Sequence, residues 1–100
     1  MKRFSTPVHY FHMEIDVSTI ERIRITYAQN GKTVLQKEDD EISWVDNVAV
    51  VKLTQRETAM FSRNNSVEIQ VRVLTANGDS LFSEIRRISC EKVLDEEVWP

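Results

Sequence analysis

Hydrophobic and polar residues alternate most clearly over residues 66–75, "SVEIQVRVLT". Four aliphatic residues share one parity while charged and amide side chains take the other, which predicts a half-buried β-strand. The aliphatic positions are Val67, Ile69, Val71 and Val73. The following run, "DSLFSEIRRIS", alternates less regularly, so the turn between the two runs must decide how they pair.

That turn contains Asn-Gly, a strong hairpin signal. A two-residue turn would pair Val71 with Glu84 and Ile69 with Arg86. Both charged side chains would then lie on the buried face of the sheet, which is costly. A three-residue loop over residues 76–78, with its glycine in the left-handed conformation as a G1 bulge, pairs Val73 with Leu81 and Ile69 with Ile85. We therefore predict the three-residue loop.

A second Asn-Gly turn occurs in "AQNGKT". A three-residue loop over residues 29–31 aligns Ile25 with Leu35, whereas a two-residue turn sets Ile25 opposite Gln36. The apolar match favours the three-residue loop here as well. The bulge positions then belong to the chain's two glycines, Gly31 and Gly78. No other position is expected to need a positive φ.

The other segments complete an all-β pattern. Residues 7–16 read as a first strand, and residues 47–53 as a strand that is apolar on both faces. The charged stretch 37–44 is more typical of a loop than of a strand. Thr54 followed by Glu57 forms a capping box, which predicts a short helix over residues 55–61, with Met60 and Phe61 tucked beneath it.

These elements predict an all-β fold, an immunoglobulin-like antiparallel β-sandwich of about six to seven strands with one short helix near 55–61. A small barrel is the alternative. The chain of 100 residues is long enough for one core. We therefore expect a single domain over residues 1–100, with residues 91–100 as a C-terminal tail.

Composition narrows the function classes. Thirteen basic residues are scattered among sixteen acidic ones, for a net charge of −3, so no nucleic-acid partner is expected. The longest apolar stretch, Val48 to Val51, is far shorter than the roughly 20 residues of a membrane span. The chain starts with basic residues, but polar residues and Pro7 interrupt the apolar core that a secretory signal peptide needs after them, so such a signal is not expected.

The residues that could serve in catalysis or metal binding are each explained more simply by a structural role. His9 and His12, three residues apart on a strand, point to opposite faces. Cys90 is the only cysteine, so no disulfide and no multi-cysteine metal site can form within the chain. The acidic run 38–41 lacks the spacing and the turn glycine of a calcium loop. We expect no catalytic residues, no metal and no cofactor.

Surfaces remain as the candidates for function. Four apolar residues fall on the outward parity of their strands, where they contact a partner or are covered by the helix or a terminal segment. Three more lie in the acidic tail, which either docks back, binds a partner or is disordered. The candidate partner contacts are Val48, Val50, Leu74, Phe82, Leu94, Val98 and Trp99. Trp44 presents the same alternatives.

Several stretches resemble short, mostly uncharacterised proteins encoded in the tail-gene regions of prophages of Firmicutes and related bacteria. They include "TPVHYF", "VKLTQRETAMF", "VEIQVRVLTANGDS" and "VLDEEV". Arg56-Glu57 and the basic "SEIRRISC" depart from the pattern of that group. The resemblance implies an immunoglobulin-like sandwich similar to the N-terminal domains of phage baseplate proteins, and it implies no enzymatic activity.

The leading functional hypothesis is therefore a non-enzymatic phage or prophage structural or assembly protein that acts through protein contacts in or near the tail or baseplate. Its partners would be other phage structural proteins or further copies of itself, in the host cytoplasm or the virion. The alternatives are a small carbohydrate- or ligand-binding module for contact with the host surface, and a prophage-encoded regulator directed at the host.

Overall fold

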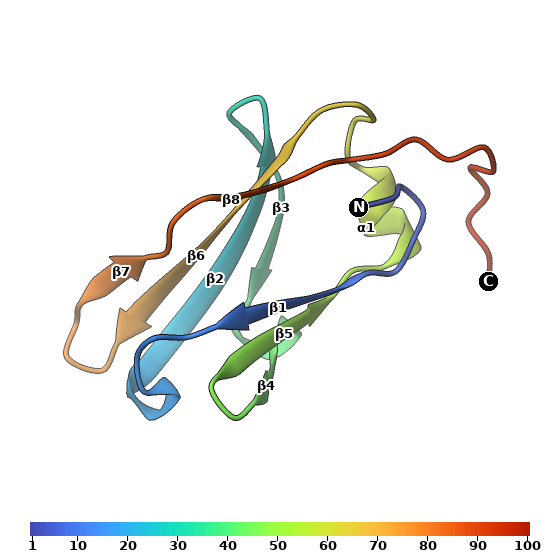
Figure 1. The fold of residues 1–100 in the computed structure, drawn as a ribbon. Helices are drawn as coiled ribbons and strands as arrows, with labels where there is room; N and C mark the ends of the chain where they lie inside the picture. Colours follow the sequence, from blue (N-terminus) through green and yellow to red (C-terminus); the bar gives the residue numbers. More distant parts are fainter.

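The computed structural model describes residues 1–100, which form two antiparallel β-sheets packed face to face (Figure 1). The smaller sheet has the order β1-β5-β4, with β1 Val8–His12, β5 Val48–Lys52 and β4 Ser43–Val45. The larger sheet has the order β3-β2-β6-β7, and β8 also pairs with β6. Its strands are β2 Ile20–Gln29, β3 Lys32–Glu38, β6 Val67–Thr75, β7 Ser80–Phe82 and β8 Arg86–Ile88. The predicted all-β sandwich is confirmed.

Three short helices join the strands. The α-helix α1, Gln55–Ala59, connects β5 to β6, and the 3-10 helices η1, Val17–Thr19, and η2, Asp39–Glu41, follow β1 and β3. The capping box of α1 is present as predicted: the Thr54 hydroxyl accepts from the Glu57 amide, and the Glu57 carboxylate accepts from the Thr54 amide. Phe61 is buried beneath it as expected, whereas Met60 is exposed. No helix has the length and apolar character needed to cross a membrane.

The core lies between the two sheets. Alternate side chains of each strand point inward, so the smaller sheet contributes Phe11, Ala49 and Val51, and Leu53 follows directly after β5. The larger sheet contributes Ile23, Ile25, Tyr27, Val67, Ile69, Val71 and Val73. All four aliphatic positions predicted for residues 66–75 are buried.

The hairpin after β6 is partly as predicted. Residues 76–78 form the loop, Gly78 has φ +87°, and Val73 lies opposite Leu81. The predicted pairing of Ile69 with Ile85 is wrong, because Ile69 lies opposite Arg86.

The register slips by one residue at Ser83. Its hydroxyl accepts from the Val71 amide at 2.9 Å, while its own amide donates to the Val71 carbonyl at 2.8 Å. The Ser83 carbonyl accepts from the Gln70 side chain instead. A side-chain oxygen therefore replaces one ladder carbonyl, the strand is divided into β7 and β8, and Ile85 is left exposed.

The hairpin between β2 and β3 differs from the prediction. Asn30 and Gly31 form a two-residue turn with φ values of 52° and 76°, both positive as a type I′ turn requires. A bulge then shifts the register, so Ile25 lies opposite Lys37 and not opposite Leu35. The turn follows the local Asn-Gly preference, and the bulge returns Leu35 to the inner parity opposite Tyr27.

Two further expectations are wrong. The charged stretch 37–44 is not a plain loop, since β3 runs to Glu38, η2 follows, and β4 begins at Ser43. Five residues other than glycine have positive φ, four of them Asn or Asp, whose short polar side chains tolerate this region. They are Phe4, Asn30, Asp39, Asp46 and Asn64.

Candidate interaction surface

Apolar side chains gather on the outer face of the smaller sheet, which no other layer covers in Figure 1. Two come from β1, two from β5 and one from β4, and we call them the valine–tyrosine patch: Val8, Tyr10, Val45, Val48 and Val50. Tyr10 is 55% exposed and Val45 is 61% exposed. Scattered apolar residues are normal on a protein surface, whereas a contiguous group indicates a contact site.

The pairing of the strands brings the patch together. Tyr10 lies opposite Val50, and Val48 lies opposite Val45 on the other side of β5. Cross-strand neighbours have Cβ atoms only about 5 Å apart, so these side chains form one continuous surface. The inward parity of β5 is filled by Ala49 and Val51, which explains why this strand is apolar on both faces.

The structure divides the predicted partner contacts among three places. Val48 and Val50 belong to the patch, where both are half-buried. Leu74 and Phe82 lie on the outer parity of the larger sheet, on the opposite side of the sandwich. They do not form one surface with the first pair, and Phe82 packs against the Arg72 guanidinium at 5.0 Å from its ring centroid.

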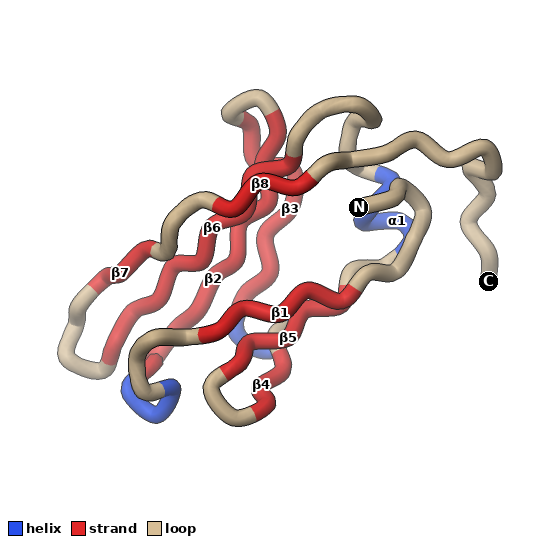
Figure 2. The backbone as a smooth tube through the Cα atoms, in the orientation of Figure 1, coloured by secondary structure: helices blue, strands red, loops and turns tan.

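The remaining three predicted contacts lie on the segment after β8, which has no regular structure (Figure 2). Leu94 is 98% exposed, Val98 is half-buried, and the indole of Trp99 is largely exposed. The Trp99 amide donates to the Gln55 side-chain oxygen, and the Gln55 side-chain nitrogen donates to the Trp99 carbonyl, both at 2.9 Å. The segment therefore docks back onto α1 through its backbone, with its large apolar side chains facing outward.

An ion pair between Arg3 and Glu96 also holds this segment. Arg3 donates in addition to the Ala59 carbonyl at 3.1 Å, so it links the start of the chain, α1 and the segment. Under the segment lies a polar hollow of about 280 Å³, bounded by residues 2–5, Gln55 and Trp99 among others.

The sequence analysis missed Val8, Tyr10 and Val45. The first two have the parity opposite to Phe11 in "VHYF", so alternation alone marks them as outward. Val45 carried no such signal, because its strand has three residues and was expected to be a loop.

The two histidines do lie on opposite faces of β1. His12 is exposed, whereas His9 points inward and its Nδ1 lies 2.7 Å from the Tyr27 hydroxyl. Burial, and then the nearby Arg86 guanidinium, lower the pKa of His9, so the neutral ring can accept from that hydroxyl. Burial likewise raises the pKa of Tyr27, which stays protonated. This pair ties β1 to β2 across the core.

A buried ion pair joins β3 to α1. The Lys37 ammonium of β3 lies 2.5 Å from the Glu57 carboxylate of α1, and their side chains are only 10% and 19% exposed. Burial raises the pKa of Glu57, but the bonds from Lys37 and from the Thr54 amide outweigh it and lower that pKa overall. An inward charge on an edge strand also discourages pairing with other chains.

The acidic run 38–41 has a structural role. Asp39 accepts a hydrogen bond from the Ile23 amide at 3.0 Å, and Glu38 and Glu41 complete the capping box of η2. Glu38 also pairs with Arg24 at 2.5 Å. No group of three or more His, Cys, Asp or Glu side chains is arranged to hold a metal ion.

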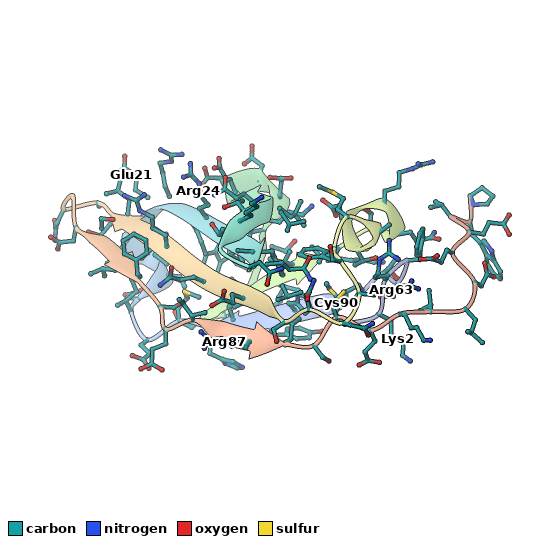
Figure 3. The ribbon with its side chains drawn as sticks, turned by 90° about the horizontal axis from the view of Figure 1, so that it is seen from above. Lys2, Glu21, Arg24, Arg63, Arg87 and Cys90 are labelled. Atoms are coloured by element: carbon teal, nitrogen blue, oxygen red, sulfur yellow. The ribbon has the colours of Figure 1, made fainter.

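Cys90 is a free and buried thiol that closes one end of the core. Its carbonyl accepts from the Asn64 amide at 2.8 Å, and Figure 3 shows it close to Arg63. Burial raises the pKa of the thiol. A buried, protonated thiol is a weak nucleophile, so the residue acts here as a small apolar side chain.

No protein-family model, curated protein or solved structure matches the chain. The functional inference therefore depends on the geometry of the residues and on the resemblance of the motifs.

Proposed function

We propose that this chain is a non-enzymatic structural or assembly protein of a phage or prophage tail or baseplate, and that it binds another tail protein through the valine–tyrosine patch. The observation that carries the proposal is the continuous apolar surface on the outer face of the smaller sheet. The tail setting, with a place in the host cytoplasm or the virion, and the immunoglobulin-like type of sandwich are supported by the resemblance of the motifs alone.

The patch suits a flat apolar surface on a protein partner. It projects from three paired strands, so its side chains are already held in position and lose little conformational entropy on binding. Burying one exposed aliphatic or aromatic side chain contributes about 1.5–3 kcal/mol. Tyr10 offers an apolar ring and a hydroxyl that can reach a polar rim, which is why tyrosine is common at protein interfaces.

The test is a binding measurement with purified tail proteins encoded beside the chain, using light scattering to find complexes and calorimetry to measure the Kd. The double variant Tyr10→Ser/Val45→Ser should weaken the Kd by about 100-fold, since each 1.4 kcal/mol is a factor of ten. Met60→Ser is the matched control, because Met60 is equally exposed but lies at the end of α1. It should leave the Kd unchanged.

Two results would remove the proposal. Absence of binding to every tail protein of the gene cluster is one, and equal loss of binding in the double variant and the control is the other. Binding to a glycan array that is lost in Trp44→Ala would instead favour the carbohydrate-binding function.

A further inference from the structure

Three arginines converge on the outer face of the larger sheet. Arg22 and Arg24 project from β2 and Arg72 from β6, around a recess of about 130 Å³ that also includes Leu74 and Ser80. We call this site the arginine recess. Arg24 and Arg72 are direct cross-strand partners. Like charges in that position repel each other, so the pair is unfavourable unless an anion lies beside it.

The chain supplies only part of that anionic charge. Glu38 pairs with Arg24 at 2.5 Å and lies 4.0 Å from Arg22, and Asp39 lies 3.9 Å from Arg22. Two carboxylates therefore face three guanidinium groups, and both lie on the Arg22–Arg24 side of the recess.

Arg72 has no carboxylate within 4 Å and is nevertheless held in place. Its guanidinium stacks on the Phe82 ring, and its Nε donates to the Ser80 hydroxyl at 3.1 Å. Its two terminal nitrogens are left to bind a ligand. A planar guanidinium held in this way matches the two oxygens of a carboxylate.

The segment after β8 carries chemistry that complements the arginine recess. Asp95 and Glu97 have no basic group within ion-pair distance, unlike Glu96. The neighbouring Leu94 and Trp99 are exposed, while Gln55 and Arg3 fix the backbone and Glu96. The acidic segment 94–99 is thus held at Glu96 and at Trp99, which lowers the entropic cost of binding.

The segment cannot reach the recess of its own molecule. The molecule is 47 Å long, and β7, which borders the recess, lies at one end in Figure 1 while residue 100 lies at the other. Any contact between the two must join different molecules.

We propose that the arginine recess binds the acidic segment 94–99 of a second copy of this chain. In this contact a carboxylate of Asp95 or Glu97 lies between Arg24 and Arg72, and Leu94 or Trp99 packs against Leu74 and Phe82. The two surfaces are different, so the contact is heterologous, and every open assembly has one unused recess at one end and one unused segment at the other. The site lies on the face opposite the valine–tyrosine patch and is independent of the proposed function.

Sedimentation of the full chain over a range from micromolar to millimolar provides the test. We expect head-to-tail oligomers at 50 mM NaCl that weaken at least tenfold at 300 mM NaCl, because exposed charge pairs are screened by salt. Arg72→Gln should abolish them, and so should Asp95→Asn/Glu97→Gln. The matched control is Arg87→Gln, since Arg87 is exposed but lies on β8 opposite Glu68 and does not line the recess. Circular dichroism confirms that each variant is folded.

Mixing the two variants gives the decisive result. The recess variant retains its segment, and the segment variant retains its recess, so an equimolar mixture should form a dimer that cannot grow further. A monomeric wild-type chain at 50 mM NaCl would overturn the proposal, and so would a mixture that stays monomeric. Inorganic phosphate that binds at Arg72 without any self-association would mean an anion site for a different ligand. Oligomers lost in Tyr10→Ser/Val45→Ser but kept in Arg72→Gln would place self-association on the valine–tyrosine patch.

Discussion

The ion pair between Lys37 and Glu57 offers the sharpest test of how the sandwich is held closed. Replacing Lys37 by Met keeps the length of the side chain but leaves the Glu57 carboxylate without its main partner. Replacing Glu57 by Gln preserves the capping box, since Gln also serves at that position of a helix, but leaves the Lys37 ammonium with Glu41, 3.7 Å away, as its only partner.

The burial of the pair sets the magnitude. Removing one partner of a fully buried pair costs about 3–5 kcal/mol, and an exposed pair contributes about 0–1 kcal/mol. With side chains 10% and 19% exposed, and with Glu41 near enough to share the charge, we expect about 2 kcal/mol for each single variant. For a chain of this size that corresponds to a fall in Tm of roughly 8–16 °C.

The measurement is urea unfolding of the wild type, both single variants and the double variant Lys37→Met/Glu57→Gln. The double variant should lie within about 1 kcal/mol of wild type, because no unpaired charge remains, and the coupling free energy should then be about 3 kcal/mol. Arg87→Met serves as a control from an exposed pair with Glu68 and should cost less than about 1 kcal/mol. Additive effects in the cycle, or single variants as stable as wild type, would refute the role given to this pair.

Two further predictions concern a turn and a buried histidine. Gly78→Val should destabilise the fold by about 1–2 kcal/mol, because φ is +87° at this position and a β-branched residue is strained there. Gly78→Asn should cost less, because asparagine tolerates positive φ. Equal urea unfolding midpoints for the two variants would contradict this explanation. His9 has a pKa below 6.5 in the folded protein, so its contribution to stability is complete above pH 6.5 and is lost as the pH falls through that lower pKa. Urea midpoints measured between pH 7 and pH 5 should fall less in His9→Gln than in wild type, and parallel curves would exclude this linkage.

Local patterns were sufficient for part of this fold. The alternation in residues 66–75 identified β6 and its buried face, because a period of two depends only on the pleat. The spacing of Thr54 and Glu57 identified the start of α1, because both hydrogen bonds form within one turn. Each of these signals lies within about ten residues.

The failures came where a distant residue decides the local structure. The register of β2 and β3 places Lys37 inward, where its main partner is Glu57, which reaches it from α1. The slip at Ser83 depends on a side-chain hydroxyl that replaces a backbone acceptor of Val71. No pattern within one strand contains either fact.

The candidate surface was predictable only in part, for the same reason. Parity showed that Val48 and Val50 face outward, but the order of the strands determines which other outward residues are their neighbours. The arginine recess likewise exists only because β2 and β6 pair in the register that sets Arg24 opposite Arg72.

The pairing of β2 with β6 has a consequence for synthesis of the chain. The two strands at the centre of the larger sheet are joined through an intervening stretch that includes all of the smaller sheet except β1. A ribosome must therefore release the chain as far as β6 before the central ladder can close, and until then the backbone groups on one edge of β2 have no partner. We expect slow, late folding and a nascent chain that depends on chaperones to avoid aggregation.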